Sequence, residues 1–171
     1  MAAPQRITVR IKKNADGRAS LSCTRADGTT TWQKLDGGQA AFFPRHDLTH
    51  YAVETVLGHK RGFFGLVSEG WDLTEFGARD ARRTIPAEAL LSEMTVGLLD
   101  VERAAGEQVT PDDINDRLRE LCEENGLPKP HVLTEEELGK VRQRRAELFE
   151  LWEAVKPGDA LELPFDVAAS P

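Results

Sequence analysis

The fold class is decided by residues 6–35, RITVRIKKNADGRASLSCTRADGTTTWQKL. Apolar residues occupy every second position from Ile7 to Ile11, and the positions between them are polar or basic. This alternation is typical of a β-strand with one buried face. Asp-Gly pairs at residues 16–17 and 27–28 separate three such segments, and Asp-Gly favours tight hairpin turns. The sequence therefore predicts an antiparallel meander of three strands.

A helical period replaces the alternation after this stretch. We expect a helix over residues 45–57, begun by Pro44 and ended by Gly58. Residues 62–77, GFFGLVSEGWDLTEFG, are apolar and interrupted by glycine, which indicates one short helix and a turn. Helix start and stop signals predict three further helices. The first covers residues 86–106. The second lies between Thr110 and Gly126, and the third runs from the Thr134–Glu137 capping box to Pro157. The predicted apolar stripe of the first of these is Leu90, Met94, Leu98 and Val101.

The last segment with strand character is ALELPFDV, residues 160–167, which can pair with the N-terminal sheet. Hairpins followed by helices indicate an α+β fold. We expect residues 1–171 to form a single domain. In it, an N-terminal antiparallel β-meander of three strands, joined by a C-terminal strand, packs against about five helices. Residues 168–171 are predicted to be a flexible tail.

The overall composition narrows the class of protein. The net charge is −7, from 22 basic and 29 acidic residues, which argues against a nucleic-acid partner. No apolar run has the length of a membrane helix, and the N-terminus lacks the apolar core of a signal peptide. We therefore expect a cytoplasmic protein without a membrane partner. Cys23 and Cys122 form no CxxC pair and are expected to be buried free thiols.

Three of the four histidines lie within FFPRHDLTHYAVETVLGH, residues 42–59. On a helical wheel with His46 at the origin, His50 falls at about 40°, Glu54 at about 80° and Asp47 near 100°. Two imidazoles one helical turn apart can bind the same divalent ion. The sequence therefore predicts a metal site with His46, His50 and Glu54 as ligands and zinc as the expected ion.

The third ligand has alternatives, because Glu69 or His59 can take the place of Glu54. Glu54 can instead accept a hydrogen bond from a histidine ligand and so orient its ring. In an enzyme, Asp47 or Glu69 is the candidate catalytic base toward a metal-bound water. Asp47 has a second interpretation, since an acid in the first turn of a helix also favours the helix dipole.

The segment His46-Asp47-Leu48-Thr49-His50 resembles the His-Glu-x-x-His signature of zinc hydrolases, with aspartate where that family has its general base. In members that use a glutamate ligand, it comes from a following helix at a separation similar to that of Glu69. Val56 stands where the all-histidine subtype has its third ligand. The same segment is similar to the His-Asp-x-x-His zinc motif of ubiquinone-biosynthesis scaffold proteins, whose further glutamate is replaced here by Gly62. The wider stretch, residues 44–72, also resembles an uncharacterised bacterial family.

These observations favour a divalent-metal-binding protein, with metal-dependent hydrolysis of a small-molecule or peptide substrate as its possible activity. The alternative is a non-catalytic protein-interaction domain in which the His, Asp and Glu cluster is structural. A homo-oligomer is compatible with either interpretation.

Overall fold

The structure is a computed structural model, and it describes residues 5–35, 39–77 and 84–167. The strands are β1 Gln5–Lys13, β2 Ala19–Arg25, β3 Thr30–Leu35 and β4 Ala160–Val167. The helices are α1 Gln39–Leu57, α2 Phe63–Ser68, the short 3-10 helix η1 Leu73–Gly77, α3 Ala87–Ala105, α4 Pro111–Glu124 and α5 Glu135–Ala154. The predicted tail, residues 168–171, lies outside the described residues.

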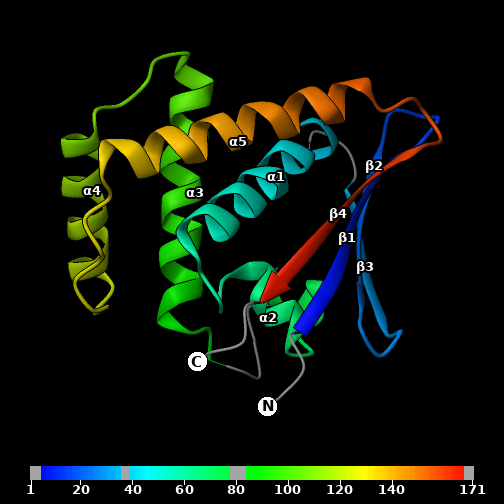
Figure 1. Cartoon of the computed structure of the whole chain (residues 1–171), viewed down its shortest axis with the longest axis horizontal. Helices are drawn as coiled ribbons and strands as arrows, with labels where there is room; N and C mark the ends of the chain where they lie inside the picture. Colours follow the sequence, from blue (N-terminus) through cyan, green and yellow to red (C-terminus); the bar gives the residue numbers. More distant parts are fainter. Residues whose placement is uncertain (1–4, 36–38, 78–83, 168–171) are drawn as a thin grey trace.

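The four strands form one antiparallel sheet in the order β3-β2-β1-β4. The three-strand meander and the return of the last strand to the first are thereby confirmed, and so is the α+β class. Ile7 and Val9 pair with Phe165 and Leu163 of β4, so the two ends of the described chain lie side by side (Figure 1). The apolar residues of β1 are all buried, as their alternation predicts.

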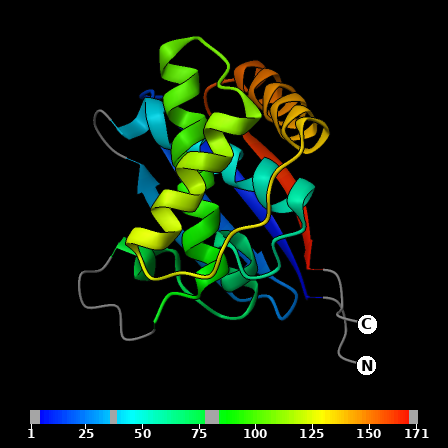
Figure 2. The same ribbon diagram turned by 90° about the vertical axis from the view of Figure 1, so that its left-hand side faces the viewer.

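Two apolar cores stack beside the sheet. The first lies between the inner face of the sheet and helices α1, α2 and α5. The second joins α1 to α3, α4 and α5, with Val53, Val96 and Leu138 among its members. Helix α4 and the extended segment after it form the outermost layer on this side (Figure 2). Helix α1 therefore contributes to both cores.

This central position changes the expected character of α1. Asp47, Thr49, His50 and Glu54 are buried together with the apolar residues between them, so residues 47–54 of the helix are enclosed on all sides. The helix also begins at Gln39, ahead of the predicted start, with Pro44 inside it. The extra turns are held by Phe43, which packs against the first core, and by Phe42, which stacks on the ring of His46.

The predicted stripe of α3 is wrong in detail. Val101 is 65% exposed, whereas Ala89, Val96 and Leu99 are buried. The helix is buried on a neighbouring face because it packs against α1 on one side and α4 on the other. As a result, its buried surface includes polar residues. These are Ser92, Thr95, Asp100 and Glu102.

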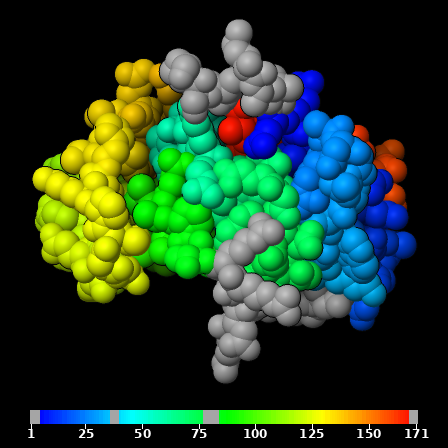
Figure 3. All heavy atoms as spheres, turned by 90° about the horizontal axis from the view of Figure 1, so that it is seen from below, coloured from blue at the N-terminus to red at the C-terminus, as the bar shows by residue number. Residues whose placement is uncertain are grey.

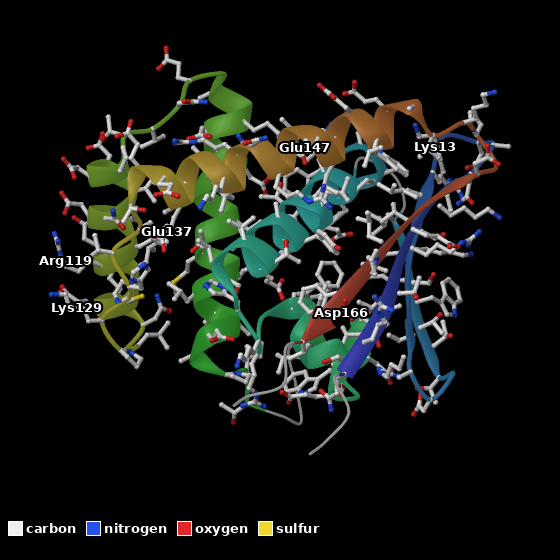
Figure 4. The ribbon with its side chains drawn as sticks, viewed as in Figure 1. Lys13, Arg119, Lys129, Glu137, Glu147 and Asp166 are labelled. Atoms are coloured by element: carbon white, nitrogen blue, oxygen red, sulfur yellow. The ribbon has the colours of Figure 1, made fainter. Side chains whose placement is uncertain are left out.

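The ends of α4 and α5 follow their sequence signals. The Thr110 hydroxyl accepts a hydrogen bond from the Asp113 amide, and Thr134 and Glu137 form a capping box. At the other end of α5, the Lys13 Nζ donates to the carbonyls of Trp152 and Val155, at 3.0 and 2.8 Å. This residue of β1 thereby caps the helix and ties it to the sheet (Figure 4).

A buried ion-pair cluster fastens α3 to α5. Glu102 contacts Arg142 at 2.5 Å and Arg145 at 3.0 Å. Its carboxylate also accepts a hydrogen bond from the Val109 amide, which leads into α4. One carboxylate therefore holds three segments together. Cys23 and Cys122 are buried and free, as predicted. Among the described residues, no helix has both the length and the apolar character needed to cross a membrane.

Candidate metal centre

His46 and His50 lie one turn apart on α1 and point toward α3. Their ring centroids are 4.8 Å apart, and the two ring planes are inclined by 75°. His50 is almost wholly buried, with its side chain 3% exposed, and the side chain of His46 is 12% exposed. The predicted spacing therefore does bring the two imidazoles together.

The third member of the group is Glu93 of α3. Its Oε2 lies 2.7 Å from Nε2 of His50, and its Oε1 lies 3.7 Å from Nε2 of His46. One ligand atom from each of His46, His50 and Glu93 lies within 4.8 Å of the other two. The side chain of Glu93 is 59% exposed, so it approaches from the open side of the histidine pair.

The opposite nitrogen of each imidazole contacts a buried carboxylate. Nδ1 of His46 donates to Oδ2 of Asp100 at 2.6 Å, and Nδ1 of His50 donates to Oε2 of Glu54 at 3.3 Å. These contacts fix the orientation of both rings and leave both Nε2 atoms directed toward Glu93. Histidines that bind metals in proteins are typically held in this way by a carboxylate on the far nitrogen.

Glu54, a predicted ligand, lies behind His50. Its side chain is fully buried, and its Oε1 accepts a hydrogen bond from the Phe64 amide at 3.0 Å. Gly62 is packed so closely against this carboxylate that a Cβ there would overlap it. Glu54 thus occupies the orienting position that the sequence left open as an alternative, and it stands apart from the group formed with Glu93.

Asp47 directly follows His46 in α1. It is buried, and its Oδ2 has no hydrogen-bond partner within the described protein. Burial raises the pKa of Asp47 to about 7, although His46 and His50 act in the opposite sense. A buried carboxylate oxygen without a partner is rare in proteins.

The carboxylates also determine the charge state of His50. Burial alone would lower its pKa, but the hydrogen bonds to Glu54 and Glu93 raise the pKa of His50 to about 10. The hydrogen bond from His50 lowers the pKa of Glu93 below its ordinary value. Burial raises the pKa of Glu54. The imidazole of His50 and the carboxylates around it therefore interact strongly, because they lie in a buried region of low dielectric constant.

The other two candidate residues lie elsewhere. Both carboxylate oxygens of Glu69 contact the Arg61 guanidinium, at 2.8 and 2.9 Å. Nδ1 of His59 lies 2.6 Å from the Ser92 hydroxyl. Neither residue belongs to the group of His46, His50 and Glu93. The chain turns sharply after α1, and this turn carries both residues away from the helix face that bears the histidine pair.

A cavity of about 350 Å³ opens over the histidine pair. Its polar lining consists of His46, Asp47, His50, Glu93 and Gln33. Its apolar lining consists of Phe43, Phe63, Leu73, Phe76, Ile85, Ala89 and Leu90. Figure 3 shows one face of the region that contributes this lining, where residues of α2 and η1 lie between the sheet and α3.

Sequence reasoning missed Glu93 and Asp100 because both lie on a helix more than forty residues after the histidines. One signal was present. Glu93 and Asp100 are seven residues apart, which places them on one face of α3, within an otherwise apolar segment. An acidic residue close to the predicted apolar stripe of a helix calls for a partner, and the histidines of α1 are suitable ones.

Comparison of the chain with protein-family models, curated proteins and solved structures finds no match. The resemblance of residues 46–50 to the zinc motifs therefore stays a prediction.

Proposed function

We propose that His46, His50 and Glu93 bind one divalent metal ion, and that this ion serves a reaction in the adjoining cavity. The observation that carries the proposal is the orientation of the two imidazoles. Asp100 holds Nδ1 of His46 and Glu54 holds Nδ1 of His50, so both Nε2 atoms point to the same place. That arrangement supplies nitrogen ligands together with the carboxylates that orient them.

The ligand atoms of the three residues lie within 4.8 Å of one another, so they have to draw together to hold one ion. Two ligand atoms at about 2.1 Å from a tetrahedral ion are about 3.4 Å apart. Nε2 of His50 and of His46 lie 2.7 and 3.7 Å from the oxygens of Glu93, on either side of that value. Glu93 is the exposed member of the group, so its side chain can move without disturbing the buried histidines.

Two histidines and one carboxylate form a ligand set found in catalytic zinc sites, and the same set also suits iron and manganese. Three protein ligands leave a coordination position open for water or substrate. Here the open side is the cavity, which Asp47 and the histidines line together. An ion at this position lowers the pKa of a bound water and makes it a nucleophile near neutral pH.

Asp47 is the candidate general base for that water. It is next to His46 in the chain and belongs to the cavity lining, and its Oδ2 is buried without a hydrogen-bond partner within the described residues. The proposed reaction is therefore hydrolysis by a metal-activated water, with Asp47 accepting its proton.

The metal is tested by titrating chelator-treated protein with Zn²⁺, Co²⁺ and Mn²⁺ in a calorimeter. We expect one site per chain in the wild type and loss of that site in His46→Ala and His50→Ala. His131→Ala is the matched control, because the side chain of this histidine is 68% exposed and pairs with Glu137 on the surface. Absence of a stoichiometric site in the wild type, or an equal site in His50→Ala, contradicts the proposal.

A further inference from the structure

The cavity above the candidate metal centre has a composition that restricts what it can hold. Three phenylalanine rings and four aliphatic side chains make up most of its lining, and the remaining lining residues are polar. Phe63 packs on the ring of His50 with centroids 5.3 Å apart, and Phe76 packs on Phe63 at 4.5 Å. A continuous aromatic surface therefore leads directly to the histidine pair.

The size of the cavity sets the scale of the ligand. A void of about 150 Å³ accommodates a benzene ring. The cavity has about twice that volume, at about 350 Å³. It is therefore suited to one ring with a polar substituent, or to a compact bicyclic molecule, and is too small for a folded peptide segment.

The charged side chains that line the cavity restrict the head group of the ligand. Among the described residues that line it, the ionisable groups are two imidazoles and the carboxylates of Asp47 and Glu93, and none is lysine or arginine. The two carboxylates would match the two positive charges of a bound divalent ion, so the described lining offers no excess positive charge of the kind that binds phosphate, sulfate and polycarboxylate ligands. The carboxylate of Asp47, which belongs to the lining, instead favours a ligand that presents an N–H or O–H group.

From these features we infer that the cavity binds a small, uncharged aromatic compound whose carbonyl group reaches the metal and whose neighbouring N–H or O–H group reaches Asp47. Aromatic amides and their analogues have this chemistry. The inference rests on the proposed function for the metal contact, whereas the fit of the ring depends only on the cavity wall.

Three probes, each titrated into Co²⁺-loaded protein, distinguish the contribution of the ring to binding from that of the head group. Benzohydroxamic and acetohydroxamic acid share the head group, and phenylphosphonate shares the ring but carries an anionic head. We expect benzohydroxamic acid to shift the visible bands of the cobalt and to bind at least about tenfold more tightly than acetohydroxamic acid, because burial of the ring adds to its affinity. Equal affinity for the two hydroxamates, or tighter binding of phenylphosphonate, would overturn the inference.

Two variants test the wall. Leu90→Trp fills the cavity from its half-buried rim and should abolish the preference for the ring, while the bands of the bound cobalt remain. Val101→Trp is the control, because this residue of the same helix is 65% exposed and lies outside the cavity lining. Phe76→Ala, which removes part of the wall, should weaken the ring preference even if Leu90→Trp does not fold. An unchanged preference in Phe76→Ala contradicts the assignment.

The two proposals fail in different ways. Cobalt that binds without any preference for the aromatic hydroxamate leaves the metal site intact and removes the inference. If no cobalt binds, the metal proposal fails, and the cavity is then tested by titrating metal-free protein with benzamide. Methyl resonances of Ile85 and Leu90 that shift on titration support the aromatic site, and unshifted resonances overturn it.

Discussion

His46 of α1 and Asp100 of α3 meet across the contact between the two helices, with Nδ1 of the imidazole 2.6 Å from Oδ2 of the carboxylate. Both side chains are nearly buried, at 12% and 9% exposure. The contact holds the ring in the orientation that directs Nε2 toward Glu93. An acid from a distant segment of the chain thereby orients a histidine of the candidate metal site.

Asp100→Ala should lower the affinity for the metal by about 10- to 100-fold while all three ligands remain, as is typical when a residue behind a ligand is lost. Competition with a chromophoric chelator measures the change. Asp116→Ala is the control, since Asp116 pairs with Arg119 on the surface of α4. An affinity in Asp100→Ala equal to that of the control would show that the contact does not support the site.

Two glycine substitutions should have opposite effects. Gly62→Ala places a Cβ against the buried Glu54 carboxylate, and such overpacking costs about 1–3 kcal/mol of the free energy of unfolding. Gly97→Ala, within α3, meets nothing nearby and should stabilise the protein by about 0.5–1 kcal/mol. Urea unfolding compares both variants with the wild type. Gly62→Ala should also weaken metal binding because Glu54 orients His50, and a variant of unchanged stability and affinity would refute this packing.

The Glu102 cluster should make stability depend on pH. Burial alone would raise the pKa of Glu102, but hydrogen bonds from Arg142, Val109 and Arg145 hold it below its ordinary value of 4.5. A depressed pKa means that the stabilisation is present above pH 4.5 and is lost as the pH falls through the lower value of the folded state.

Glu102→Gln should therefore destabilise the protein at neutral pH by about 3–5 kcal/mol, because two buried guanidinium groups lose their anion. The difference from the wild type should shrink as the pH falls below about 4.5. Urea unfolding at a series of pH values measures it. A difference that stays constant with pH would mean that the charge of Glu102 is not what stabilises the cluster.

Asp47→Asn tests the proposed role of the base. The zinc-loaded wild type should hydrolyse some members of a panel of aryl esters and amides, and the variant should be slower by about 10²–10⁴-fold with zinc still bound. Zinc content and rate are measured on the same samples. Equal rates at equal zinc content, or no metal-dependent hydrolysis in the wild type, would exclude this chemistry for Asp47.

The sequence predicts the sheet well because its signals are local. The alternation in β1 and the Asp-Gly turns fix strands and hairpins, and the Thr110 and Thr134 caps mark the starts of α4 and α5. The burial of residues 47–54 of α1 on all sides is a consequence of packing between two cores, and no local pattern reveals it. The apolar stripe of α3 is misplaced for the same reason.

The same distinction between local and long-range contacts applies to the residues of the candidate site. His46 and His50 are neighbours because helical spacing alone places them together. Glu93 and Asp100 join them only through the docking of α3 on α1, which depends on contacts far apart in the sequence. Glu54 is within reach of the histidines by spacing, but the Phe64 amide and the close approach of Gly62 determine its position behind His50.

The central claim is tested most directly by anomalous diffraction from crystals grown with Zn²⁺, recorded on both sides of the zinc absorption edge. The account predicts one anomalous peak per chain, about 2.0–2.2 Å from Nε2 of His46, Nε2 of His50 and an oxygen of Glu93. A peak elsewhere, or His50 still hydrogen-bonded directly to Glu93 with no peak between them at saturating zinc, would contradict it.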